Sequence, residues 1–105
     1  TSPWSAEGLT VYTTYRIAKE LYGEDYAREH YVDQWQQAVD DYYLDFYVRN
    51  PDYLANLPED KQLEITGNLT YVRQYCEMPL KMYPYLTYQE FLDACGLTEE
   101  DLSLD

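Results

Sequence analysis

Residues 25–49 carry the strongest structural pattern in the chain, because an apolar side chain recurs there at helical spacing. Projected at about 100° per residue, these side chains fall within one face about 100° wide. They are Tyr31, Trp35, Ala38, Val39, Tyr42 and Phe46. The period predicts an amphipathic helix whose apolar face packs in the core. Asn50 and Pro51 should end this helix, since the residue before a proline is pushed out of the helical region.

The opposite side of this predicted helix is acidic along its length. Its acids are Asp25, Glu29, Asp33 and Asp40, with Asp41 and Asp45 further round. Solvated helices usually interleave acids with cations, yet Arg28 is the only lysine or arginine between Lys19 and Arg49. Leu44 and Val48 also fall on this side. The last two turns are therefore apolar nearly all round, and should either enter the protein or meet a partner.

Capping signals predict helices before and after this segment. Ser5 is a suitable N-cap for a helix over residues 6–22, and Gly23 can end that helix in the left-handed conformation. Pro58 suits the first position of a third helix. Gly67 and the residue after it could mark a kink inside that helix, because glycine weakens a helix interior.

Two prolines should interrupt the chain after the third helix. Pro79 and Pro84 cannot donate a main-chain hydrogen bond, so residues 78–86 should form an ordered linker instead of a helix. Thr87 and Glu90 then form a capping box, which predicts a short helix near the C-terminus.

These signals favour an all-α fold. Residues 69–75 can also be read as a strand, but no segment keeps the two-residue alternation of a strand for long. The length suits one domain, so we expect a small single-domain helical bundle of four to five helices over residues 1–105. No apolar run approaches the about 18 residues of a membrane helix, and no signal peptide is recognisable. A cytoplasmic protein without membrane contact is therefore expected. Cys76 and Cys95 show no repeated spacing and fit buried thiols of a reducing compartment better than a disulfide, which stays the alternative.

The charge of the chain restricts its partners. Twenty carboxylates against seven lysines and arginines give a formal net charge of −13, and fourteen residues are tyrosine. Such a charge repels nucleic acids and anionic membranes over a Debye length of about 10 Å. A basic protein is the partner that this charge favours. Tyrosine suits an interface, because its ring packs on apolar groups while its hydroxyl needs a hydrogen-bond partner.

No motif indicates an enzyme, a cofactor or a metal site. His30 is the only histidine, and the two cysteines do not form a Cys-x-x-Cys pair. A nucleophilic triad would need that histidine beside a nucleophile and an oxyanion hole, and no Gly-x-Ser-x-Gly element provides one. With twenty acids, some pair always meets the separation of a glycosidase, so such a pair alone indicates nothing.

The acidic helix face and the tyrosines beside it are the candidate partner-binding site. Its residues are Asp25, Glu29, Asp33, Asp40, Asp41, Tyr43, Asp45 and Tyr47. Other tyrosines have aliphatic neighbours and should fill the core: Tyr12, Tyr15, Tyr31 and Tyr42. An acidic stripe on a surface helix is most often its solvated face, and this alternative stays open. The shortage of cations favours a binding face, because uncompensated repulsion costs stability.

In composition the chain is similar to phage-encoded DNA-mimic proteins of the anti-CRISPR and anti-restriction kind, which are small and acidic. This resemblance implies an inhibitor that blocks the basic nucleic-acid site of a nuclease or of a CRISPR or restriction effector. An immunity protein against a nuclease toxin is a close alternative. A regulatory or scaffold domain with an apolar groove near Leu44 and Val48 is another. Salt separates these hypotheses, because it weakens charge-driven binding and spares apolar binding.

Overall fold

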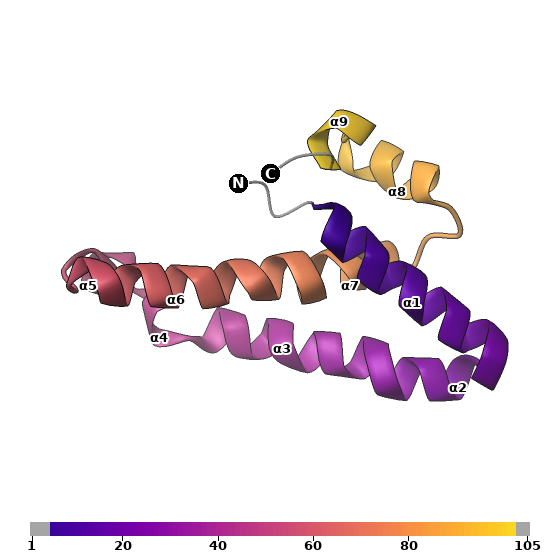
Figure 1. Ribbon diagram of the computed structural model, residues 1–105, viewed down its shortest axis with the longest axis horizontal. Helices are drawn as coiled ribbons and strands as arrows, with labels where there is room; N and C mark the ends of the chain where they lie inside the picture. Colours follow the sequence, from indigo (N-terminus) through magenta and orange to yellow (C-terminus); the bar gives the residue numbers. More distant parts are fainter. Residues whose placement is uncertain (1–4, 103–105) are drawn as a thin grey trace.

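The computed structural model describes residues 5–102, and every regular element among them is a helix. Two long helical runs lie side by side and antiparallel, as a hairpin (Figure 1). The first run joins α2 (Glu24–Ala27), the π turn η1 (Arg28–Val32) and α3 (Asp33–Leu44). The second joins α6 (Glu59–Val72), the π turn η2 (Arg73–Glu77) and α7 (Met78–Met82). The all-α prediction is confirmed for the described residues.

The remaining helices are distributed unevenly over this hairpin. The helix α1 (Ala6–Tyr22) crosses one end of it, and α8 (Tyr88–Cys95) and α9 (Glu99–Leu102) lie on the side of α1 and α7 away from α3 (Figure 1). At the other end, α4 (Phe46–Arg49) and α5 (Pro51–Ala55) connect the two runs. The expected bundle of four to five helices is not confirmed, because α1 and α8 cover only one end of the hairpin.

The helix α1 has the predicted bounds. The Ser5 side chain accepts a hydrogen bond from the main-chain N–H of Gly8, as an N-cap does. Gly23 ends the helix with a positive φ of 95°, although its ψ of 163° is extended and not left-handed helical as predicted. Gly8 is buried where α1 crosses η2 and α7. A Cβ at this position would meet the carbonyl oxygen of Gln74 and the side chain of Met78, so only glycine allows this close approach.

The helix predicted over residues 25–49 is wrong at its C-terminal end. It starts one residue earlier, contains η1 and ends at Leu44, because Asp45 adopts an extended conformation with ψ of 135°. Asp45 then caps the separate short helix α4. The break turns Phe46 away from the core face, and this side chain is 48% exposed.

The predicted break at Pro79 is also wrong. The second helical run continues from Glu59 through Pro79 to Met82. The turn before the proline is π-helical, and the main-chain N–H of Met78 bonds to the carbonyl of Arg73, five residues back. This wider turn changes the hydrogen-bond register next to Pro79, which has no N–H to donate, and the run continues. Residues 69–75 are helical throughout, as are Gly67 and its neighbours.

The C-terminal helix signals are confirmed. Thr87 caps α8, and its hydroxyl both accepts from the main-chain N–H of Glu90 and donates to the carboxylate of Glu90. Gly96 ends α8 in the left-handed conformation. The segment before α8 is tied to α1, because the Tyr12 hydroxyl donates to the carbonyl of Tyr85 at 3.1 Å.

The core lies at the end of the hairpin that α1 and α8 cover. Tyr15 is 1% exposed at its centre, and four rings surround it with centroids 5.7 to 6.5 Å away: Tyr12, Tyr31, Trp35 and Tyr83. Met78, Met82, Phe91 and Leu92 complete this core. The interior role predicted for Tyr12 and Tyr15 is confirmed, and Tyr31 and Tyr42 are half-buried.

The opposite end of the hairpin has no comparable core. None of the described residues of α4, α5 or α6 is fully buried. Large apolar side chains are open to solvent there, with Leu44, Tyr53 and Leu63 exposed by 68%, 61% and 67%. The molecule is elongated as a result. Its radius of gyration is 15.2 Å, whereas a compact domain of this length has about 13 Å.

Candidate functional site

Four of the predicted site residues align on the outer side of the α2–η1–α3 run. A π turn holds one residue more than an α-helical turn, so two turns across η1 take about eight residues in place of about seven. Asp25, Glu29 and Asp33 are spaced four apart through η1, and therefore stand one above another. Asp40 returns to the same side, and all four side chains are exposed. We call these four residues the acidic row, which is about 20 Å long.

Little positive charge lies beside the acidic row. Arg28 pairs with Glu24 at 3.1 Å and with Asp25 at 3.8 Å. Within residues 5–102, no ion pair reaches Glu29, Asp33 or Asp40. The only hydrogen bond to these three side chains in that part of the chain comes from the Gln36 amide, which donates to Asp40 at 3.0 Å. Most of the negative charge of the row is thus left to solvent or to a partner.

Two other predicted acids lie at a groove between α3 and α6. The groove encloses about 310 Å³ and is lined by Ala38, Asp41, Tyr42, Asp45, Asn68, Leu69 and Val72. Asp41 is exposed and accepts a hydrogen bond from the Gln37 amide. Asp45 is half-buried, and its Oδ1 accepts from the main-chain N–H groups of Tyr47 and Val48 at 2.8 and 3.2 Å. The Asp45 carboxylate therefore serves as a helix cap.

The two predicted contact tyrosines differ in their surroundings. Tyr47 is half-buried, with its ring edge against Phe46 at a centroid distance of 5.2 Å. Tyr43 is half exposed, but its hydroxyl is engaged and donates a hydrogen bond to Glu77. Neither tyrosine belongs to the acidic row, and the Tyr43 hydroxyl instead meets a carboxylate of the other hairpin run.

Sequence reasoning missed the buried carboxylate of Glu77. This side chain lies in η2 and accepts hydrogen bonds from the Tyr43 hydroxyl and, at 2.9 Å, from Nε of Arg73. Burial alone would raise the pKa of Glu77, but these two hydrogen bonds and the charge of Arg73 outweigh it and lower the pKa below its usual value. The pKa of Tyr43 is raised, first by its hydrogen bond to Glu77 and then by burial. The spacing of Arg73 and Glu77 was the one sequence signal for this cluster.

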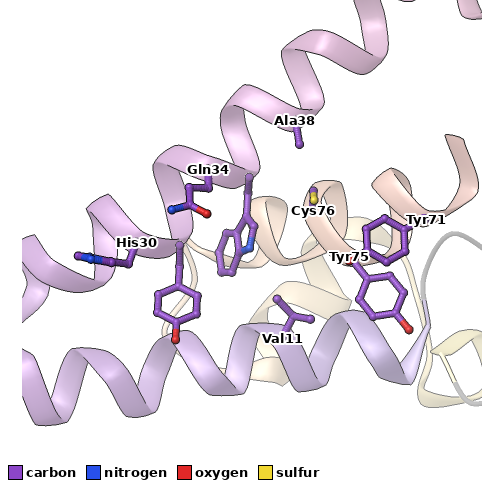
Figure 2. A pocket seen from close by; sticks show the side chains of 9 residues that line it. Val11, His30, Gln34, Ala38, Tyr71, Tyr75 and Cys76 are labelled. Atoms are coloured by element: carbon purple, nitrogen blue, oxygen red, sulfur yellow. The ribbon is translucent and has the colours of Figure 1, made fainter. Parts of the chain in front are cut away.

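A second pocket, of about 410 Å³, is lined mainly by aromatic side chains from three helical segments. We call it the aromatic pocket. Val11 comes from α1, Tyr31 and Trp35 come from the first hairpin run, and Tyr71 and Tyr75 come from the second. Figure 2 shows Tyr71 and Tyr75 together on one side, with His30 and Gln34 on the other. The sequence analysis assigned no role to this pocket.

The described residues form neither a metal-ligand cluster nor a disulfide. They contain no cluster of three or more histidine, cysteine, aspartate or glutamate side chains that could hold a metal ion. Cys76 and Cys95 form no disulfide, and Cys95 is exposed, contrary to the expectation of buried thiols. Burial raises the pKa of the Cys76 thiol, which makes this group a weaker nucleophile. No helix in residues 5–102 is long and apolar enough to cross a membrane.

Comparisons with protein-family models, with curated proteins and with solved structures find no match for this chain. Its functional interpretation therefore rests on its own residues.

Proposed function

We propose that this chain is a non-enzymatic protein-binding module whose acidic row binds a basic protein. In its specific form, the proposal is an inhibitor that occupies the nucleic-acid site of a nuclease or of a CRISPR or restriction effector. The carboxylates of the row would neutralise lysines and arginines that otherwise bind phosphates. An immunity protein against a nuclease toxin would use the same chemistry.

The observation that carries the proposal is the acidic row itself: η1 aligns the exposed acids Asp25, Glu29 and Asp33, and Asp40 of α3 lies on the same side. Among the described residues, only Asp25 of this row has a cation paired with it. Residues four apart on a helix rise about 6 Å, whereas phosphates of one DNA strand are spaced about 3.4 Å along the axis and farther apart through space. A surface that binds phosphates can therefore meet successive carboxylates of the row. Like charges held in a row cost stability, and a basic partner offsets that cost.

Neutralising the row tests the proposal. The variant carries Asp25→Asn, Glu29→Gln, Asp33→Asn and Asp40→Asn, which keep shape and remove charge. The control carries Glu20→Gln, Asp52→Asn, Asp93→Asn and Glu99→Gln, which remove the same charge from four separate helices. Binding to a CRISPR effector nuclease, a restriction endonuclease and a nuclease toxin is measured by calorimetry, together with DNA cleavage.

The expected result is that the native chain binds one of these enzymes and inhibits its cleavage of DNA. Affinity should fall at least about tenfold between about 50 and about 300 mM salt. The row variant should lose binding, and the control should keep most of it. The proposal would be contradicted if the affinity did not change with salt and the row variant bound as tightly as the native chain. It would also be contradicted if the native chain bound none of the tested enzymes of the three classes.

A second candidate function is a scaffold or regulatory domain that binds through the uncovered end of the hairpin. The observation that favours it is the exposure of Leu44, Tyr53 and Leu63 at the end of the hairpin that α1 and α8 leave uncovered. Large apolar side chains exposed near one another are typical of a protein interface. The covered end also has exposed apolar side chains, among them Ile17, Leu21 and Tyr22 of α1. Its affinity would persist at high salt, and Leu44→Ser with Leu63→Ser would abolish it while leaving binding by the acidic row intact.

A further inference from the structure

The walls of the aromatic pocket suit a flat cation. Tyr71 and Tyr75 stack with centroids 4.5 Å apart and planes inclined by 18°. Trp35 and Tyr31 meet edge to face at 6.2 Å on the other hairpin run. Among the described residues no lysine or arginine lines the pocket, and Val11 and Ala38 add apolar surface between the aromatic groups (Figure 2). Aromatic faces attract cations through their quadrupole, most strongly where water is partly excluded.

The charge of the chain disfavours anionic ligands at the aromatic pocket. The chain carries a net charge of −13, and Glu7 of α1 lies near enough to Tyr75 to act on it electrostatically. The pKa of Tyr75 is raised by burial first, and then by Glu7 and by Tyr71. These charges favour a neutral or positive ligand over an anionic one.

The indole of Trp35 adds a hydrogen-bond requirement. Trp35 is 5% exposed and lines the pocket. Within residues 5–102 no hydrogen bond engages its N–H, and no side-chain nitrogen or oxygen there is both fully buried and unpartnered. The indole N–H is therefore not fully buried and keeps some contact with solvent. A ligand that displaces this solvent needs an acceptor for the N–H, since an unmade bond is costly.

We propose that the aromatic pocket binds an arginine side chain carried by an extended peptide segment of a basic partner. The planar guanidinium stacks on a tyrosine face on the Tyr71–Tyr75 side of the pocket, while its stem packs on Val11 and Ala38. A main-chain carbonyl of the same segment accepts from the Trp35 indole. Lysine fits less well, because its ammonium is a strongly hydrated point charge. This proposal rests on the proposed function, in which the partner is a basic protein.

Small probes test the pocket without the partner. The ¹⁵N-labelled protein is titrated with N-acetyl-arginine N-methylamide and, as its uncharged isostere, with N-acetyl-citrulline N-methylamide. The chain has two tryptophans, and the indole N–H of Trp35 is the reporter. The arginine probe should shift this resonance saturably, together with the amides of Tyr71 and Tyr75. The citrulline probe should bind roughly three- to thirtyfold more weakly, as expected for loss of a cation–π contact.

Three variants test whether the arginine probe binds in the aromatic pocket. Tyr71→Leu and Tyr75→Leu each remove an aromatic face from the pocket and should weaken binding of the arginine probe about three- to tenfold. Tyr53→Leu is the matched control, because Tyr53 is an exposed tyrosine of α5 outside the pocket and its removal should change nothing. Equal affinity for arginine and citrulline would overturn the proposal, as would shifts confined to the acidic row. The row-neutralised variant should still bind the probe. The proposal for the pocket and the proposal for the acidic row can therefore be refuted separately.

Discussion

At the scale of single residues, Glu77 shows how this acidic chain accommodates a buried carboxylate. Its side chain is 4% exposed and is held between a tyrosine hydroxyl and an arginine. The cluster also joins the two hairpin runs, because Tyr43 belongs to α3 while Arg73 and Glu77 belong to η2. Breaking a buried charged hydrogen bond costs more than breaking an exposed one.

Glu77→Gln should therefore destabilise the protein by about 1–3 kcal/mol at neutral pH. Glu64→Gln is the matched control, since the same substitution there removes an exposed ion pair with Lys61 and should cost less than about 0.5 kcal/mol. Urea unfolding of both variants measures the difference. Similar free energies of unfolding for the two variants would show that the buried cluster contributes no more than a surface pair.

The loss of stability in Glu77→Gln should also depend on pH in a defined direction. Because the pKa of Glu77 is lowered on folding, its contribution is present above the unfolded pKa of about 4.3 and is lost as the pH falls through the folded value. The stability difference between the native chain and Glu77→Gln should therefore be constant near neutral pH and shrink as the pH falls from about 5 toward about 3. A difference that grows on acidification would contradict the lowered pKa.

At the scale of elements, the position of α1 depends on one glycine. Gly8 brings α1 against the carbonyl of Gln74 and the side chain of Met78. A methyl group added at Gly67 in α6, by contrast, would meet no atom of residues 5–102 within 4 Å beyond its own helix turn. The same substitution should therefore act in opposite directions at the two sites.

Gly8→Ala should destabilise the fold by about 1–3 kcal/mol, because the added methyl group forces α1 away from η2. Gly67→Ala should stabilise it by about 0.5–1 kcal/mol, since alanine is the better helix former and meets no neighbour. Thermal and urea unfolding give both values. If Gly8→Ala were also stabilising, the close contact of α1 with η2 would be wrong.

Sequence reasoning succeeded where a helix end depends on neighbouring residues. Ser5 and Thr87 cap helices through hydrogen bonds within three residues of themselves, so their patterns predict the starts of α1 and α8. It failed at Asp45, where the apolar period predicted a continuous helix, and at Pro79, where the proline predicted a break. At Asp45 a strong local cap overrode the period, and at Pro79 a π turn absorbed the missing donor.

The candidate sites also differ in how far the sequence predicts them. Exposure of Asp25, Glu29 and Asp33 follows from helical periodicity alone, although their alignment depends on η1. The aromatic pocket was beyond prediction, because Val11, Trp35 and Tyr75 are brought together only by the packing of three helical segments. No spacing along the chain encodes that contact.

At the scale of the whole molecule, the two ends of the hairpin differ in what holds them. One end contains the tyrosine-centred core and is covered by α1 and α8 (Figure 1). At the other end, none of the described residues of α4 and α5 is fully buried, and the side chains of Leu44, Tyr53 and Leu63 face solvent. Local opening needs less free energy where few apolar side chains are buried.

Hydrogen exchange should therefore divide the molecule into two parts. Amides of α4, α5 and the first turns of α6 should exchange at least about tenfold faster than those of α1, α7 and the core-facing turns of η2, since they open without disrupting the core. Leu63→Ser should leave the slow amides unchanged, whereas Met82→Ala, which removes a buried core side chain, should accelerate them all. Uniform protection along the hairpin would mean that its uncovered end opens only by global unfolding. A partner that docks on Leu44, Tyr53 and Leu63 should slow exchange in α4, α5 and the first turns of α6. A partner bound to the acidic row should instead protect α2, η1 and α3 as far as Asp40 and leave α5 fast, so the same measurement separates the two candidate functions.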